Sequence, residues 1–473
     1  MLYGFEKESI PVIHKKRELK KEEPRSKIEL RLGGCTTQIK QEVLKMDYTQ
    51  NAKIAQVTEK TLIIGVDIGS ESHYARAFNW RGQELSKKAF HFADDVEGYK
   101  ALSQWIDTNK ARLEAEKVII GFEPTGHYWF SFGRYVKKHG MMLVLVNPYH
   151  VKQIKELDDN SPKKTDSKDP KTIAKLVVDG RYSIPYIPEG VYAELRQAVS
   201  SRDRIIKEQN ALTNRIKRWL KIYFPEYLKV YTTFSAESGL LLLEKAPLPA
   251  EIVELGVDGV TQIWRERKLR AVGKKRAMTL VEAAKNSVGI EGGACAKLEL
   301  QLLLADYRTK QAQLEQVEAV LKTEVLKVPN VEKLLAIKGI GLITVGGFLS
   351  EVGEIGRFDS PKQIQKLAGL ELKENSSGKH KGQTSISKRG RKKLRKTIFQ
   401  AVLPLIRSNA EFSDVYRYYT TRQKNPLKGK QAVIAVGCKL IRIFYTLLTK
   451  GVDYDAERMR SDIIRPTDDG QAA

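Results

Sequence analysis

The feature that most constrains the fold is an alternation of strand and helix patterns between residues 61 and 148. Three strand patterns come first, TLIIGVDIG, HYARAFNW and ELSKKAFHF, with a turn at Arg81 and Gly82 before the third. An amphipathic helix pattern, a strand in KVIIGFEP, a helix closed by Gly140 and a strand in MMLVLVNP follow. The order β-β-β-α-β-α-β predicts three antiparallel strands that lead into parallel strands covered by helices.

This order is that of the RNase H-like fold, so we predict an α/β RNase H-like (RuvC-like) domain. The 473 residues are too many for one ordinary core. Residues 189–227 and 296–327 are charged, carry apolar residues at helical intervals, and predict the two arms of an antiparallel coiled coil or dimerisation stalk. The expected segments are a basic, dispensable extension (1–45), a linker (46–60), the RuvC-like domain (61–187), a helical coiled-coil region with an insert (188–330), a mainly α C-terminal domain (331–450) and a tail (451–473).

The balance of charge indicates the kind of partner. Lysine and arginine number 82 against 57 acidic residues, a net charge of +25, which favours nucleic acid over a neutral metabolite. An acidic membrane surface is the competing partner. We find no apolar stretch of the roughly 18 residues that a spanning helix needs, and no apolar signal region after the N-terminus. We therefore expect a soluble, intracellular protein without a membrane partner.

The metal-ligand types in the chain favour oxygen ligands. Cys35, Cys295 and Cys438 are widely separated, so neither a disulfide framework nor a cysteine zinc site is supported. The seven histidines include no pair at a ligand-like spacing. Any bound metal is then a hard ion held by oxygens, which means magnesium or manganese.

Four carboxylates occur where such an ion could bind. Asp67 ends the first strand and Glu123 ends the fourth, and the two strands are neighbours in this topology. Asp166 and Asp169 are three residues apart at a helix start and would face one direction. Grouped carboxylates repel one another unless cations neutralise them, and two magnesium ions about 4 Å apart would also hold the reacting oxygens of a phosphodiester. Taken singly, each is also explained as a helix N-cap, a turn residue or a loop carboxylate.

Two motifs in the last third of the chain indicate phosphate contacts. Gly339 and Gly341 in AIKGIG resemble the turn of a helix-hairpin-helix, although an ordinary tight helix connection explains them equally. A serine-rich polar loop then leads into a strongly basic helix, for which a solvated charged face is the alternative. The candidate nucleic-acid contacts here are Lys379, Lys381, Lys388, Arg389, Arg391 and Lys392.

Taken together, VDIGSESHYARAF, GFEPTGHYWF, KKTDSKDPKTIAKL, AIKGIG and AGLELKENSSGKHKGQTSISKRGRKKLR resemble the DEDD transposases of insertion-sequence family one-ten, the bridge-RNA-guided recombinases. The resemblance extends from Met46 to about residue 450. It places the catalytic serine at Ser377 in NSSG, with Ser376 as the adjacent competitor. The metal-binding tetrad of the family falls on Asp67, Glu123, Asp166 and Asp169. One departure is the segment Glu371–Lys373 after AGL, where family members often have a proline.

The resemblance implies metal-dependent DNA strand cleavage and rejoining through a phosphoserine, with Mg²⁺ or Mn²⁺ as cofactor. It also implies a structured noncoding RNA whose loops pair with donor and target DNA. A homo-oligomer, dimer or tetramer, would bring the serine domain of one protomer to the RNase H-like domain of another. The implied location is the cytoplasm of a prokaryote, in association with the nucleoid.

Three other functions compete with this one. A metal-dependent RuvC-like endonuclease would use the same carboxylates with water, rather than serine, as the nucleophile. An actin-like ATPase is suggested by IIGVDIGSES, but the second phosphate loop and the glycine-rich adenosine motif of that fold are not evident. A non-enzymatic nucleic-acid scaffold would need neither the carboxylates nor the serine.

Overall fold

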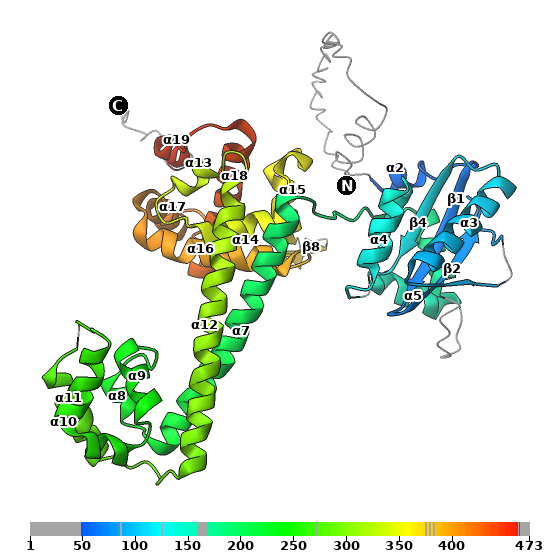
Figure 1. Cartoon of the computed structure of the whole chain (residues 1–473). Helices are drawn as coiled ribbons and strands as arrows, with labels where there is room; N and C mark the ends of the chain where they lie inside the picture. Colours follow the sequence, from blue (N-terminus) through cyan, green and yellow to red (C-terminus); the bar gives the residue numbers. More distant parts are fainter. Residues whose placement is uncertain are drawn as a thin grey trace, which may run out of the picture. The chain divides into compact units, whose positions relative to one another are not determined.

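The structure is a computed structural model, and it describes residues 49–85, 88–124, 126–158, 169–270, 272–373, 376–377, 380–381, 384–461 and 463 (Figure 1). For residues 155–158, 376–377 and 380–381 the description is of the backbone. The predicted extension at 1–45, the predicted ligand Asp166 and the predicted contact Lys379 lie outside the described residues.

A six-stranded mixed sheet forms the N-terminal domain, in the order β3-β2-β1-β4-β5-β6. β1, β2 and β3 are antiparallel neighbours, β4 and β5 continue parallel to β1, and β6 pairs antiparallel with β5. The strands are β1 (Thr61–Ile68), β2 (Ser72–Phe78), β3 (Phe90–Ala93), β4 (Lys117–Phe122), β5 (Met142–Val146) and β6 (Tyr182–Ser183). The helices are α2 (Gln50–Ile54), α3 (Val96–Arg112), α4 (Trp129–Lys138), α5 (Pro148–Asp158) and α6 (Asp169–Val178).

Helices cover both faces of this sheet, because β1 and β4 are apolar at almost every position and need burial on both sides. Even-numbered residues of β1, such as Ile64, share a core with Leu102 of α3 and Phe132 of α4. The odd-numbered Ile63 shares the opposite core with Ile173 and other residues of α6. The predicted mixed α/β domain, consistent with an RNase H-like fold, is confirmed.

Two details of this domain differ from the sequence prediction. The third strand was expected from Glu84, but β3 begins at Phe90, and Glu84 forms an isolated bridge to Phe78 instead. Helix α5 and strand β6 were not predicted. β6 has two residues, which is too short for an alternation of apolar and polar residues to show in the sequence.

A pair of long antiparallel helices, α7 (Val191–Tyr223) and α12 (Ala294–Leu326), follows the sheet domain (Figure 1). Contacts fix their direction, since Arg202 pairs with Glu318 whereas the Trp219 indole, further along α7, donates to the Ala296 carbonyl near the start of α12. Between them lie α8 (Tyr227–Val230), α9 (Glu237–Lys245), α10 (Pro249–Glu266) and α11 (Lys274–Lys285), whose core includes Trp219 and Trp264.

The remaining chain is mainly helical and packs around one core with the start of α7 and the end of α12. Its helices are α13 (Val331–Leu335), α14 (Leu342–Val352), the 3-10 turn η1 (Ile355–Arg357), α15 (Pro361–Leu367), α16 (Lys392–Ser408), α17 (Ala410–Thr421), α18 (Gly429–Lys450) and α19 (Ala456–Arg460). Its strands are β7 (Leu372–Lys373), β8 (Ser376–Ser377), β9 (His380–Lys381) and β10 (Ser385–Ile386). The mostly helical C-terminal region is thus confirmed.

Helix α18 corrects one expectation. By length and composition its 22 residues are apolar enough to cross a membrane, although the sequence was expected to hold no such stretch. Phe444, Leu440 and Val436 of this helix are fully buried against α16 and the other helices of the C-terminal core. Core burial therefore accounts for the apolar composition.

Candidate active site and serine ribbon

Asp67 and Glu123 lie at equivalent positions on adjacent parallel strands. The last registered pair between β1 and β4 is Val66 with Phe122. Asp67 is the next residue in β1, and Glu123 is the residue that follows β4. Both side chains are half-buried. Because side chains alternate along a strand, Asp67 shares its face with Gly65, and Glu123 follows Gly121 in the same way. The register thus places these two residues side by side at the ends of the neighbouring strands, as the sequence predicted.

That shared face is the one on which α6 packs, and glycine permits the close approach. A Cβ at Gly65 would lie 1.8 Å from the Pro170 carbonyl oxygen, so the first turn of α6 rests directly on the backbone of β1. A Cβ at Gly121 would lie 2.5 Å from Val177 on the next turns of α6. Asp169, the first residue of α6, therefore sits at the end of the helix nearest to Asp67.

Carboxylate oxygens of this kind suit a hard divalent ion, and the closeness of strands and helix fits one. Among the described residues, however, no three His, Cys, Asp or Glu side chains are grouped as a metal site. Asp67, Glu123 and Asp169 each have an interaction partner in the structure. The fourth predicted ligand, Asp166, lies in the segment 159–168 that is not described. The metal site predicted for Asp67, Glu123, Asp166 and Asp169 therefore stays a prediction.

The predicted serine loop is a β-ribbon. β7 pairs antiparallel with β10 at its base, and β8 pairs antiparallel with β9 beyond it. Ser377 is registered with His380, and Ser376 with Lys381, which leaves two residues between Ser377 and the returning strand. Position 378 is a glycine in the sequence and lies outside the described residues. Both candidate serines are thus in the outer strand pair.

Backbone hydrogen bonds close the base of this ribbon. Lys388 N donates to the Gly369 carbonyl at 3.0 Å, and Arg391 N donates to the Leu367 carbonyl at 2.6 Å. Gly369 has a φ of +68°, and a Cβ there would lie 2.9 Å from the Arg389 carbonyl oxygen. Arg395, which was not predicted, also holds the base: its guanidinium donates to the carbonyls of Ala368 at 2.8 Å and Lys388 at 3.3 Å. Glycines on both sides of a serine-rich segment were the signal that its two ends meet.

The KGIG turn joins α13 and α14, and packing explains the first of its two glycines. Gly339 has a φ of +96°, and a Cβ there would lie 3.0 Å from the Ser408 hydroxyl at the end of α16. The Asn409 amide also donates to the Lys338 carbonyl at 3.0 Å. Gly341 caps the start of α14, and a Cβ there would meet no atom within 4 Å. Gly339 therefore serves a tight helix connection, and phosphate contact at Gly341 stays a prediction.

The predicted basic contacts differ in their exposure. Lys388, Arg389 and Lys392 are exposed at the ribbon base and at the start of α16. Arg391 is half-buried and forms an ion pair with Glu351 at 3.4 Å. Lys381 lies in β9, of which the backbone is described. Exposed cations at this edge suit an anionic partner.

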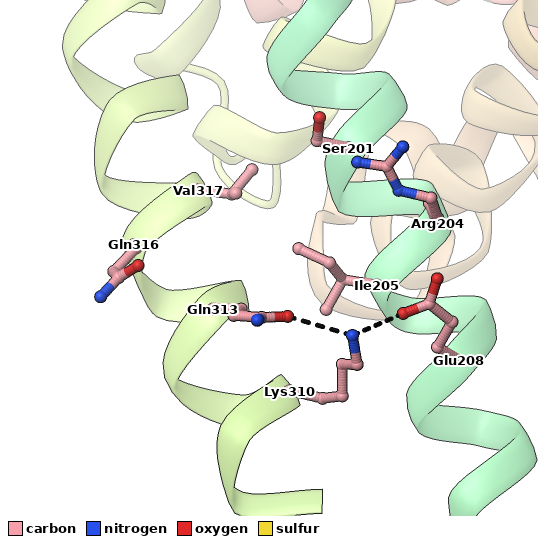
Figure 2. Close-up of a pocket in the computed structure, with 8 residues that line it drawn as sticks. All are labelled: Ser201, Arg204, Ile205, Glu208, Lys310, Gln313, Gln316 and Val317. Carbon is pink, nitrogen blue, oxygen red and sulfur yellow. Dashed lines mark hydrogen bonds and ion pairs between the residues drawn. The ribbon is translucent and has the colours of Figure 1, made fainter. Parts of the chain in front are cut away.

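A separate hollow lies between α7 and α12 (Figure 2). Lys310 crosses it, donating to Glu208 at 2.7 Å and to Gln313 at 3.2 Å. The residues that line it are Ser201, Arg204, Ile205, Glu208, Lys310, Gln313, Gln316 and Val317. None of the predicted site residues is among them, so the hollow does not belong to the candidate active site.

Two family models match the chain. One, described as a transposase and named for DEDD transposases of IS110, matches residues 64–225. The other, the transposase IS116/IS110/IS902 family, matches residues 331–417. The first covers Asp67, Glu123, Asp166 and Asp169, and the second covers the serine ribbon.

Similar curated proteins come from bacterial insertion elements. A probable family 20 transposase of Pseudomonas aeruginosa is 23% identical over 348 residues, which is 71% of this chain and 85% of that protein. An uncharacterized protein of insertion element IS116 from Streptomyces clavuligerus is 22% identical, over 81% of this chain and 94% of that protein. The transposase for insertion sequence element IS1111A of Coxiella burnetii is 22% identical, over 79% and 90%. With both family models in their expected places, the chain belongs to the IS110 family of DEDD transposases, and it is a DNA transposase.

Proposed function

We propose that this transposase cleaves and rejoins DNA through a covalent phosphoserine on Ser377, with Mg²⁺ or Mn²⁺ held by Asp67, Glu123, Asp166 and Asp169. The observation that carries the proposal is the parallel register of β1 and β4, which sets Asp67 beside Glu123 on the face that α6 covers. A divalent ion bound there would neutralise the carboxylates and draw electron density from the phosphate that is attacked. The chain itself supplies the nucleophile and the positions of the ligands.

The chemistry balances without an energy source. The Ser377 hydroxyl oxygen attacks a DNA phosphorus, its proton leaves, and a serine O–P bond forms while the P–O3′ bond breaks. The departing 3′-oxygen takes up a proton and becomes a free 3′-hydroxyl. Rejoining reverses these steps, because a 3′-hydroxyl from another strand attacks the phosphoserine and releases the serine. One phosphodiester is lost and one is gained, so no ATP is needed.

We further propose that a structured noncoding RNA guides the reaction and that protomers assemble through α7 and α12. A net charge of +25 suits a protein that holds RNA and two DNA duplexes. Exposed Lys388, Arg389 and Lys392, with Lys379, Lys381 and the Gly341 turn, would contact nucleic-acid backbones. Pairing between α7 and α12 in one chain leaves their outer faces available to a second copy, so that serine and carboxylates from two protomers can meet.

Ser377→Ala tests the nucleophile, with Ser376→Ala as the matched control on the same two-residue strand. Each variant is incubated with Mg²⁺, guide RNA and end-labelled donor DNA, and protein-linked label is counted after denaturation. We expect Ser377→Ala to lose the covalent adduct and Ser376→Ala to retain it. Cleavage that persists in Ser377→Ala without any adduct would establish the water-using endonuclease instead.

The guide RNA is tested by recombination with purified components. RNA transcribed from the noncoding DNA beside the gene is added to protein, donor and target, and joined products are sequenced. We expect products that depend on the RNA and that move to a new target when its pairing loop is changed. Equal product without RNA would refute guidance while leaving the phosphoserine chemistry untouched.

A further inference from the structure

We propose that three arginines, Arg196, Arg357 and Arg391, form a binding site for one phosphate of the DNA backbone beside the base of the serine ribbon. We call these residues the arginine cluster. The choice of DNA as the source of the phosphate rests on the proposed function, and the site itself rests on geometry and charge. None of the three lies in the sheet domain, and neither Arg196 nor Arg357 was singled out by the sequence.

Arg196 supplies the donor that lacks a partner. It lies in the first turns of α7, and its Nε donates to the Ser350 carbonyl at 3.1 Å, which fixes the guanidinium in place. Its Nη2 is buried, and among the described residues it has no hydrogen-bond partner. A buried N–H group without an acceptor costs about 1 to 3 kcal/mol, and more when the group is charged. An acceptor from outside the chain would remove this cost.

Arg357 is held by an aromatic ring. Its guanidinium carbon stacks 3.7 Å from the centre of the Tyr186 ring, and the Tyr186 hydroxyl accepts from Glu354 N at 3.3 Å. A Cβ at Gly353 would lie 2.3 Å from that hydroxyl, so glycine is what lets the ring sit here. Stacking uses the flat face of a guanidinium, while Nη1 at its N–H edge donates to the Val352 carbonyl at the long distance of 3.5 Å, so an oxyanion can compete for this edge.

Arg391 places the cluster next to the ribbon. It directly precedes α16, its backbone N–H closes the ribbon base on Leu367, and its guanidinium pairs with Glu351 at 3.4 Å. That distance is long for a charge-assisted hydrogen bond, for which roughly 2.7 to 2.9 Å is typical. Among the described residues, the arginine cluster forms one ion pair, that of Arg391 with Glu351. Three guanidinium groups therefore share one carboxylate.

The cluster therefore carries an excess positive charge in partly buried surroundings. Burial, with repulsion from Arg391 and Arg196, lowers the pKa of Arg357 to about 10. Burial likewise lowers the pKa of Arg196, with repulsion from Arg391 adding to it. Buried charges in proteins are normally paired, so two guanidinium groups without a carboxylate of their own indicate a missing anion.

A phosphate fits this position better than a carboxylate ligand does. Several arginines that converge on one oxyanion are a common way to bind phosphate, because each offers two parallel N–H donors. The start of the 17-residue helix α16 adds its positive dipole end at Arg391. Since the ribbon that carries Ser377 begins and ends at this same place, a DNA strand that reaches the ribbon would pass the cluster.

Binding to DNA without divalent metal tests the site apart from catalysis. Fluorescence anisotropy with a labelled duplex of about 30 base pairs in EDTA is measured over a range of salt for wild type and Arg196→Gln. We expect affinity to fall about tenfold, and the slope of log K against log salt to fall by about one, as for one lost phosphate contact. Arg202→Gln is the matched control, since Arg202 lies on the same helix in an ion pair with Glu318 and should leave both values unchanged.

Glu351→Gln is the opposing test. It removes the carboxylate that competes for Arg391 and should strengthen DNA binding, whereas a purely structural cluster would give no gain in DNA affinity from this change.

A second measurement uses inorganic phosphate as the ligand. Inorganic phosphate should raise the Tm of wild type above that in chloride of equal ionic strength, and this difference should vanish in Arg196→Gln. Equal DNA binding by wild type and Arg196→Gln would overturn the proposal. The proposal would also be overturned if Arg196→Gln weakened binding to RNA of the same length but not to DNA. A phosphate effect on Tm that vanished in Arg196→Gln without any change in DNA affinity would overturn it as well. None of these outcomes depends on whether Ser377 forms an adduct.

Discussion

The carboxylate edge and the serine ribbon are built in opposite ways. Asp67 and Glu123 extend from two buried strands with a continuous ladder, and α6 is pressed onto the same strands through Gly65. Ser377 is in a strand of two residues, and its ribbon is tied to the helical core at the base, through Gly369, Lys388 and Arg395. A folded core thus sets the positions of the predicted ligands, and a short attachment sets that of the proposed nucleophile. Changes in the first region should cost stability and activity together, whereas changes in the second should cost activity alone.

Asp67→Asn should have the largest effect on the rate of DNA cleavage. A small effect would contradict the role given to the carboxylates in this comparison. The side chain keeps its size while losing the charge that a metal needs, so we expect strand cleavage to fall by about 10³-fold or more, in line with a loss of electrostatic stabilisation. Initial rates of cleavage of labelled donor DNA measure this. Asp107→Asn, on α3, is the control. Near-normal cleavage by Asp67→Asn would remove Asp67 from the site.

Gly65→Ala should lower the free energy of unfolding more than Gly121→Ala does. The new methyl at position 65 would meet the Pro170 carbonyl, which is backbone and cannot rotate away, and we expect a loss of about 3 kcal/mol. The methyl at 121 meets the side chains of Val177 and Ile173, which can shift, and about 1 kcal/mol is expected. Urea denaturation gives both values. If the two variants were equally stable, α6 would not rest on β1 as described.

Gly369→Ala separates activity from stability at the ribbon base. Both Gly369 and Gly82 have positive φ, so a side chain strains each by about 1 kcal/mol. Nothing lies within 4 Å of a Cβ at Gly82, whereas at Gly369 the methyl would press on Arg389 and Lys388. We expect Gly369→Ala to lower recombination about tenfold and Gly82→Ala to leave it unchanged, at similar Tm. Equal activity would mean that the base does not position the serine.

A pH dependence of stability should be the smallest effect, and it belongs to the sheet domain. Burial lowers the pKa of His73, whose Nε2 lies 3.5 Å from Asp94, too far for a strong hydrogen bond. Burial raises the pKa of Asp94, but hydrogen bonds from Tyr99 and Ser131 outweigh this and leave it below its usual value.

The unfolded chain therefore binds protons more readily than the folded one at both residues. Stability from His73 is complete above a pH of about 6.5 and decreases as the pH falls toward its lowered folded value. We expect the Tm to drop between about pH 7 and pH 5, and His73→Leu to flatten this drop. His139→Gln, at an exposed position, is the control and should leave the pH profile as it is.

Much of the sheet domain could be predicted because its signals are local. A strand as apolar as Thr61–Ile68, in a run of three strand patterns followed by alternating helix and strand patterns, leaves few possible topologies, and the ends of neighbouring strands then place Asp67 and Glu123. The ribbon could not be predicted in the same way. Its strands have two residues each and are held by contacts between Gly369 and the segment near Lys388, about twenty positions away, which no periodicity reveals.

The cluster of Arg196, Arg357 and Arg391 was hidden for a related reason. Its members come from three separate segments of the chain, and Arg196 and Arg357 look like ordinary surface charges in the sequence, where Arg391 alone was predicted to contact nucleic acid. Only tertiary packing removes them from water and places them within reach of one another. Convergence of this kind is a property of the fold, and a single sequence carries no mark of it.

The helices α7 and α12 have a consequence for engineering this chain. Each sends residues into two cores, since Leu195 and Val325 belong to one and Trp219 and Leu300 to the other. Every residue of an α-helix turns its side chain by about 100° relative to the one before, which follows from about 3.6 residues per turn. One residue inserted midway in α7 would rotate one set of contacts out of phase with the other. Seven residues inserted in both helices would restore the phase and lengthen the connection by about 10 Å, so its length can be varied only in steps that the helical repeat allows.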